Sequence, residues 1–296
     1  MRKLILILVL LWSSLAQAES VQYLFENEIA PGLKASITLI GDRSEQQQAS
    51  QALYKAFDRA KEAWQNLQDT PSSELGMLNQ RGKGSWSVSS DLAYAIQDAL
   101  EVARWTRGRY DPVYSETSGL FTRKDFRRVK VDTKTGKVAL KSNNLHLDLS
   151  YMVNGFVADS IADDLQLQGW ENCLVQLNDN IFLAHGQDVT GPWRIPVMDP
   201  SQGSAKHTLF YKAENLAAAT FAPEEGATWL HPRSRKPVET NLKSVTIFTQ
   251  RATQAYGFAS VIYMLGLWDG KAVLKDIKHL KAVLVDKDGE FHKFPK

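Results

Sequence analysis

Long helical segments separated by short strands run along this 296-residue chain, and their order limits the folds it can adopt. Apolar residues recur at helical spacing at 45–67, 89–107, 154–167 and 253–265. β-rich or alternating runs predict strands at 33–40, 129–131, 138–140, 173–177, 181–184, 193–197, 207–210, 245–248, 282–285 and 291–294. Turn residues at 133–136 and 288–289 join four of these strands into two hairpins. Strands in pairs favour an α+β fold over regular βαβ alternation, with mixed or antiparallel sheets packed against about four main helices in a single domain.

The first 18 residues have the pattern of a secretory signal. Arg2 and Lys3 precede an apolar run at 4–12, and Ala16-Gln17-Ala18 matches the small-residue pattern that signal peptidase cuts after. The apolar run is too short to span a bilayer. We therefore expect cleavage near Ala18, a soluble mature domain at 19–296, a periplasmic or otherwise exported location, and no stable membrane insertion.

Charge and cysteine content exclude some classes of partner and of stabilisation. Without Arg2 and Lys3, the 35 Lys and Arg residues fall to 33, which equals the 33 Asp and Glu residues. This balance predicts no nucleic-acid partner. Cys173 is the only cysteine, so no intramolecular disulfide forms, and its apolar neighbours predict a buried thiol. Stability must therefore come from a hydrophobic core.

Common catalytic motifs are absent. We find no dinucleotide fingerprint, Walker loop, G-x-S-x-G elbow or H-E-x-x-H pair, and the six histidines show no metal-ligand spacing. Asp163 and Asp164 are adjacent on a predicted helix, which favours a solvated face over a catalytic pair. The basic, proline-bounded segment 231–237 could hold a phosphate or form a solvated loop.

A series of short motifs, taken in order, resembles the periplasmic FAD:protein FMN transferase (ApbE) family over about residues 21–270. They are Ser73-Glu74-Leu75 with Leu78-Asn79, Gly108-Arg109-Tyr110-Asp111-Pro112, Val129-Lys130-Val131-Asp132, Leu147-Asp148-Leu149 with Gly155-Phe156-Val157-Ala158-Asp159, Gly191-Pro192-Trp193-Arg194 with Asp199-Pro200, Pro232-Arg233, Pro237-Val238, and Ser244-Val245-Thr246-Ile247. The resemblance implies an exported enzyme that splits the pyrophosphate of FAD. It also implies transfer of FMN to a Thr or Ser of an acceptor protein, with Mg²⁺ as the metal.

The positions that correspond to the family's metal ligands are Tyr151, Tyr256 and Ser260. Members of the family carry D-A-x-x-T on the last long helix, where this chain reads Tyr256-Gly257-Phe258-Ala259-Ser260. A neutral phenol is a weaker Mg²⁺ ligand than a carboxylate. The resemblance therefore implies a metal site that has lost its charged ligand, and pocket-filling aromatics are the simpler interpretation of both tyrosines.

Other departures fall at positions that the family uses for flavin and phosphate. Asn154 replaces a charged residue, and Asn178-Asp179 replaces a Gly-Gly pair, which adds negative charge where phosphates would lie. The candidate cofactor-binding residues implied by the resemblance are Asp111, Asn154, Asn178, Asp179, Thr220, His231 and Arg233. We expect them to converge with Tyr256 around one cleft. Asp111 has an equal alternative as a turn-forming Asp-Pro without a ligand.

Two functions remain open at this point. The first is a divergent transferase that uses FAD and Mg²⁺, with Arg233, Arg235 and Lys236 compensating for the lost charge. The second is a degenerate family member that binds flavin or a periplasmic redox partner, or that serves as a protein-interaction module. The chain lacks the D-G-x-[ST]-G-A-T stretch that the family modifies, so an acceptor must be another protein.

Overall fold

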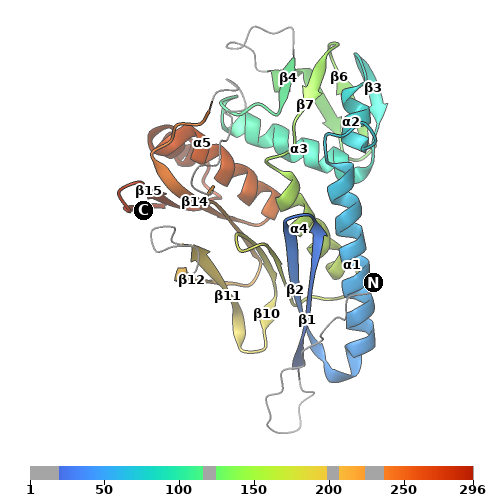
Figure 1. Cartoon of the computed structure of the whole chain (residues 1–296), viewed down its shortest axis with the longest axis vertical. Coiled ribbons are helices and arrows are strands. Elements are labelled where there is room, and N and C mark those ends of the chain that lie inside the picture. The colour runs from blue at the N-terminus through green and yellow to red at the C-terminus, as the bar shows by residue number, and fades with distance from the viewer. Residues whose placement is uncertain (1–19, 116–124, 199–206, 224–236, 296) are drawn as a thin grey trace.

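A computed structural model describes residues 20–115, 125–198, 207–223 and 237–295, and a large sheet runs through it (Figure 1). Every pair of neighbouring strands in this sheet is antiparallel. The helices and sheets of the structure confirm the predicted α+β class. The sequence predicted mixed or antiparallel sheets, and the described strand pairs are antiparallel. In spatial order the strands are β1 (Ser20–Ala30), β2 (Leu33–Asp42), β8 (Cys173–Leu177), β9 (Ile181–His185), β13 (Leu216–Phe221), β14 (Leu242–Thr249), β15 (Lys281–Asp286) and β16 (Phe291–Phe294).

Three smaller antiparallel sheets accompany the large one. They contain β10 (Gln187–Asp188), β11 (Gly191–Met198) and β12 (His207–Ala213); β3 (Gly84–Ser87), β6 (Lys137–Leu140) and β5 (Val129–Asp132); and β4 (Val113–Ser115) with β7 (Leu145–Leu147). Both predicted hairpins, β5–β6 and β15–β16, are present. Figure 1 shows that β3 to β7 gather around one end of the molecule, beside α2 and α3.

All four predicted helices form, together with a short helix that the sequence pattern did not predict. They are α1 (Gln46–Asn66), α2 (Glu74–Asn79), α3 (Ser90–Trp105), α4 (Val153–Leu167) and α5 (Ala252–Asp276). In addition, 3₁₀ turns lie at Arg43–Glu45 and Asp125–Arg128. Ser89 caps α3, because its side chain accepts a hydrogen bond from the Leu92 amide. None of the described helices is long and apolar enough to cross a membrane.

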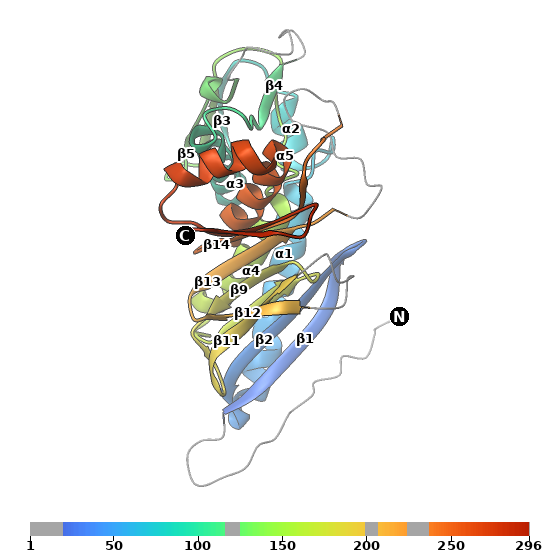
Figure 2. The same ribbon diagram turned by 90° about the vertical axis from the view of Figure 1, so that its left-hand side faces the viewer.

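Two hydrophobic cores hold the layers together. In the main core, helices pack on one face of the large sheet, and Cys173 is fully buried there, as predicted. A smaller core lies on the opposite face, where Trp193 and Ile195 of β11 contact Phe182 of β9 and Phe248 of β14. Figure 2 shows β11 and β12 in front of the large sheet and α1 behind it. The two faces of the sheet are therefore covered by different kinds of layer.

The contact between α4 and α5 fixes the start of α5. Gly155 lies against the α5 backbone so closely that a Cβ there would come within 2.4 Å of the Ala252 carbonyl oxygen. One turn later, the buried Asp159 carboxylate accepts hydrogen bonds from the Ala252 and Thr253 amides at 2.8 and 2.9 Å, and from the Thr253 hydroxyl. Arg251 Nε lies 3.3 Å from the same carboxylate. A side chain of α4 thus caps the first turn of α5.

Asp98 of α3 faces this cap and gives a pH-dependent prediction. Burial, together with the nearby Asp159 carboxylate, raises its pKa to about 7. The pKa of Asp in an unfolded chain is about 3.9. The stabilising contribution of Asp98 is therefore complete below about pH 4 and is lost as the pH rises toward 7. We expect Asp98→Asn to raise the free energy of unfolding at pH 8 by about 2 kcal/mol and to leave it unchanged at pH 4, measured by urea denaturation. Equal stabilities at pH 8 would contradict the cause given for this shift.

Candidate functional site

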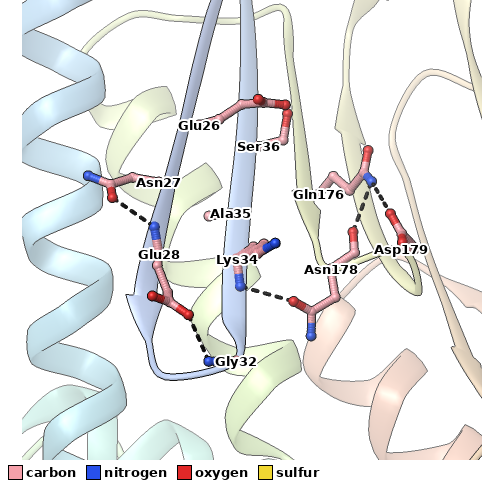
Figure 3. Close-up of a pocket in the computed structure, with 10 residues that line it drawn as sticks. All are labelled: Glu26, Asn27, Glu28, Gly32, Lys34, Ala35, Ser36, Gln176, Asn178 and Asp179. Atoms are coloured by element: carbon pink, nitrogen blue, oxygen red, sulfur yellow. Dashed lines mark hydrogen bonds between the residues drawn. The ribbon is translucent and has the colours of Figure 1, made fainter. Parts of the chain in front are cut away.

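A cleft of about 650 Å³ opens beside the β1–β2 hairpin and the end of β8 (Figure 3). The hairpin turn contains Gly32 in the left-handed region, at φ 78°, and the Glu28 carboxylate accepts a hydrogen bond from the Gly32 amide at 2.8 Å. The residues that line the cleft are Glu26, Asn27, Glu28, Gly32, Lys34, Ala35, Ser36, Gln176, Asn178 and Asp179. Two of the predicted site residues, Asn178 and Asp179, therefore lie in one cleft.

Asn178 adopts the backbone conformation that a glycine would favour. Its φ is 46°, which is in the left-handed region that asparagine tolerates better than most residues. Its amide donates to the Lys34 carbonyl at 2.8 Å, and its side-chain oxygen accepts from the Lys34 amide at 2.9 Å. Gln176 donates to the Asn178 carbonyl at 2.8 Å. The turn after β8 thus keeps a Gly-like backbone despite the loss of the Gly-Gly pair.

A second cleft, of about 290 Å³, shares Gly32 and Asn178 with the first. It is lined by Pro31, Gly32, Leu33, Trp64, Gln68, Ser150, Val153, Asn154 and Asn178. Asn154 sits at the start of α4 because the turn at Leu149–Met152 leads directly into that helix. The structure therefore places Asn178 and Asp179 in the larger cleft, and Asn154 and Asn178 in the smaller one.

The charge of the larger cleft is mainly acidic among the described residues. Glu26, Glu28 and Asp179 contribute carboxylates, whereas Lys34 contributes the one cation of this lining. All four residues are exposed. Carboxylates at this position oppose the approach of a phosphate. His231 and Arg233, together with Arg235 and Lys236, lie outside the described residues.

Tyr256 and Ser260 lie one turn apart on α5, and neither presents a free metal ligand. Tyr256 is 8% exposed, hydrogen-bonds the Asn154 side chain and packs against the Phe221 ring at 6.0 Å between centroids. Burial raises the pKa of Tyr256, so its phenol is neutral at pH 7. Ser260 is fully buried, and its hydroxyl donates to the Gly257 carbonyl at 2.9 Å.

Tyr151 is the third position that the sequence resemblance assigns to the metal. It is 8% exposed, and its ring meets the ring of Tyr110 edge-on at 6.3 Å. Mg²⁺ prefers hard, charged oxygen ligands in octahedral geometry. Two buried phenols and a hydroxyl that is already hydrogen-bonded do not supply them. The residues at these three positions therefore do not fit a Mg²⁺ site.

Asp111 and Thr220 are held by local structure. The Asp111 carboxylate accepts hydrogen bonds from the Val113 and Phe126 amides at 2.9 and 3.0 Å, and burial raises its pKa to about 7. The Thr220 hydroxyl meets the Thr246 hydroxyl at 2.9 Å between β13 and β14. Neither residue lines the two clefts described above. Their contact with flavin stays a prediction.

Sequence reasoning missed the cleft residues on the β1–β2 hairpin and β8. Lys34 and Glu28 flank the Pro31-Gly32 turn, which is itself a hairpin signal that was available in the sequence. Gln176 occupies the exposed side of the predicted strand 173–177, so strand alternation placed it opposite the core. These residues come together in one cleft because β2 pairs with β8. The paired residues are more than 130 positions apart in the sequence.

Comparison with known proteins places the chain in a family. The sequence profile of the ApbE family matches residues 32–284. The FAD:protein FMN transferase of Treponema pallidum (strain Nichols) is 28% identical over 259 residues, covering 73% of this chain and 71% of the relative. The FAD:protein FMN transferase of Vibrio cholerae serotype O1 is 23% identical over 276 residues, covering 83% of both chains.

Solved structures show the same fold. The flavin transferase ApbE from Vibrio cholerae superposes with a TM-score of 0.73 at 19% identity, covering 93% of this chain and 97% of that one. The apo form of the Pseudomonas stutzeri flavinyl transferase ApbE also gives a TM-score of 0.73, at 14% identity, covering 96% and 98% of the two chains. The profile match spans most of the sequence and agrees with the resemblance seen in its motifs. This chain therefore belongs to the ApbE family.

Proposed function

We propose that this chain is a divergent FAD:protein FMN transferase. The observation that carries the proposal is the turn at Asn178, which has a φ of 46° and lines both clefts in a chain of the ApbE family. The turn therefore has a backbone conformation that glycine favours, although the Asn178 and Asp179 side chains lie beside it. The relatives with this family profile carry the name FAD:protein FMN transferase, which supports the same activity here.

In the proposed reaction, the hydroxyl oxygen of an acceptor Thr or Ser attacks the FMN phosphorus of FAD. The new P–O bond joins FMN to the acceptor, the bond from that phosphorus to the AMP phosphate oxygen breaks, and AMP leaves with the electron pair. We assign no step to Mg²⁺, since the residues at the family positions do not fit it.

A second candidate function is flavin binding without transfer. The observation that favours it is the pairing of Tyr256 with Asn154 where the family resemblance places a metal-binding carboxylate. Without charge neutralisation at the phosphates, FAD would bind without losing AMP. The two candidates share the FAD site and differ in the chemistry that follows binding.

One experiment separates these candidates. The purified chain is titrated with FAD while flavin fluorescence is followed, and it is then mixed with FAD and an acceptor protein that carries a D-G-x-[ST]-G-A-T stretch. The transferase proposal predicts saturable FAD binding and release of AMP, measured by chromatography, in proportion to fluorescent acceptor on a denaturing gel. Binding without AMP release would support the second candidate. Absence of binding would exclude both.

The carboxylates that line the larger cleft predict weaker FAD binding than a neutral lining would give. Asp179→Asn removes one negative charge beside the Asn178 turn while keeping the size of the side chain, so FAD affinity should rise about fivefold. Asp288→Asn, in the exposed β15–β16 turn, is the matched control and should leave affinity unchanged. Calorimetry at low and moderate salt measures both variants, and an unchanged affinity for Asp179→Asn would place the phosphates elsewhere.

We also propose the partner and the location that the export pattern implies. Residues 1–18, which lie outside the described residues, act as a cleaved signal. Residues 19–296 form the mature ApbE-like domain, which is located in the periplasm or another exported compartment. Its partner is an acceptor protein with a flavinylated Thr or Ser, or a periplasmic redox protein. Mass spectrometry of the exported protein tests cleavage, because an intact Met1 would contradict a removed signal.

A further inference from the structure

Trp268 has the most exposed aromatic side chain among the described residues. It is 78% exposed and lies in the second part of α5, two residues after the break in the helix at Gly266. Tryptophan is usually buried over most of its surface. Trp105, at the end of α3, is 36% exposed, and neither tryptophan belongs to one of the two hydrophobic cores. Packing of the core therefore does not explain either side chain.

The second part of α5 lies along the end of α3, on the outer surface of the molecule (Figure 2). Arg107 Nη2 lies 2.6 Å from Asp276 Oδ2. Arg109 Nη2 lies 4.0 Å from an oxygen of Asp269, the residue next to Trp268. The exposed side of α5 thus continues onto the segment that follows α3.

Trp105 belongs to the same surface. Its ring meets the ring of His279, which comes just after α5, edge-on at 5.8 Å between centroids. Two aromatic side chains from distant parts of the sequence therefore lie on one face. We call this face the tryptophan patch, and it consists of Trp105, Arg107, Arg109, Trp268, Lys271 and Lys275.

The tryptophan patch carries an excess of positive charge. Lys271 lies over the Trp268 ring at 5.5 Å, and the exposed Lys275 follows one turn further along α5. Two more exposed cations, Arg104 and Lys278, flank the patch in the sequence. The two nearby carboxylates of α5 are each within 4.0 Å of an arginine, as described above. Cations are therefore concentrated here, although the chain without its first 18 residues has equal numbers of acidic and basic residues.

The shape and composition of the patch fit a lipid surface better than a protein partner. Neither of the two clefts contains a patch residue, so they offer no pocket here for an anchoring side chain of a partner. Tryptophan surrounded by lysine and arginine is typical of surfaces at a membrane–water interface, where cations attract anionic headgroups. Binding of this kind is peripheral and needs no membrane-spanning helix.

We propose that the tryptophan patch docks the chain on a bilayer that contains anionic lipids. The Trp268 ring enters the headgroup region, and the cations of the patch lie against the lipid phosphates. The patch contains no residue of either cleft, so the inference is independent of the proposed transfer of FMN.

The first test measures binding of the purified chain to vesicles by sedimentation. One set of vesicles contains phosphatidylcholine and phosphatidylglycerol, and the other contains phosphatidylcholine alone. Trp268→Ala should lower the affinity for the anionic vesicles at least about tenfold, because a large apolar surface no longer enters the headgroup region. Leu167→Ala, at the 87% exposed end of α4, is the matched control and should bind as the native chain does. Circular dichroism should show native thermal stability for both variants.

The second test removes charge from the patch. The double variant Lys271→Gln, Lys275→Gln should bind anionic vesicles about 25-fold more weakly, at about fivefold for each charge. Lys55→Gln is the matched control on α1, where the lysine side chain is 65% exposed, and should leave binding unchanged. Added salt should weaken the binding of the native chain.

Equal affinity for the two sets of vesicles would overturn the inference. Native affinity of a stably folded Trp268→Ala variant would overturn it as well. Absence of vesicle binding would also do so, and binding of polyglutamate by the same patch would then indicate an acidic protein partner. The FAD titration is a separate measurement, and its failure would refute the proposed function alone.

Discussion

Replacing Asp159 with alanine should lower the free energy of unfolding by about 3–5 kcal/mol. The fully buried carboxylate caps the first turn of α5 and faces Arg251, and no other acceptor replaces it for the Ala252 and Thr253 amides within the described residues. Its removal leaves two buried donors unsatisfied and a cavity between α4 and α5. Urea denaturation followed by circular dichroism measures the loss.

Asp163→Ala is the matched control for this prediction. Asp163 lies one turn further along α4 and binds the same Arg251 guanidinium at 2.7 and 2.9 Å, but its side chain is 46% exposed. An exposed pair contributes little, so the loss should stay below about 1 kcal/mol. Similar losses in the two variants would show that Arg251 pairing, and not the helix cap, stabilises this contact.

Replacing Tyr256 with aspartate should raise Mg²⁺ affinity in the presence of FAD at least about tenfold. The substitution places a charged oxygen one helical turn before Ser260, on the same face of α5. It also frees Asn154 from its hydrogen bond to the phenol. Transfer should increase less than metal affinity, because Asp179 still opposes phosphate approach. Calorimetry with FAD present measures the Mg²⁺ affinity directly.

Tyr263→Asp provides the comparison for this variant. Tyr263 lies on α5 and packs against the same Phe221 ring at 5.3 Å, so the variant adds an equal charge to the same helix and disturbs the same aromatic contact. Its Mg²⁺ affinity should match that of the native chain. A rise in both variants would indicate non-specific attraction by added charge, and no rise in either would exclude the Tyr256 position as the lost ligand.

Helix positions could be predicted from the sequence because each helix buries a regular apolar face. In α1, five buried alanines recur at spacings of three and four residues, and Leu53 and Phe57 are buried with them. This apolar face is sufficient to predict the helix from the sequence. The predicted helix ended at Leu265, whereas α5 continues to Asp276. In the structure, Gly266, at φ 74°, interrupts the helical backbone just after Leu265. The second part of α5 restarts where Asn241 accepts a hydrogen bond from the Leu267 amide, and a contact of this range leaves no local pattern.

The strands that were missed lack the usual β signal. Alanines dominate β13, and alanine has low β propensity, so its place in the sheet depends on β9 and β14 on either side. The alternation of Val21, Tyr23 and Phe25 in β1 ends at an exposed polar stretch, which hid the strand. Pairing with neighbouring strands, rather than residue type, defines both β13 and β1.

The candidate site shows a similar division between local and long-range information. The turn at Asn178-Asp179 and the substitution at Tyr256 are visible as departures from family motifs. The hydrogen bond between Tyr256 and Asn154 joins residues 102 positions apart. A contact of this range leaves no local pattern in the sequence.

We expect this chain to transfer FMN without a metal held by Tyr151, Tyr256 and Ser260. The most direct measurement is the mass of an acceptor protein after incubation with FAD and the native chain, in Mg²⁺ and in EDTA. We expect slow growth of a species heavier by one FMN phosphoester, at the same rate in both solutions. Transfer that requires Mg²⁺, or an acceptor mass that never changes, would contradict the account.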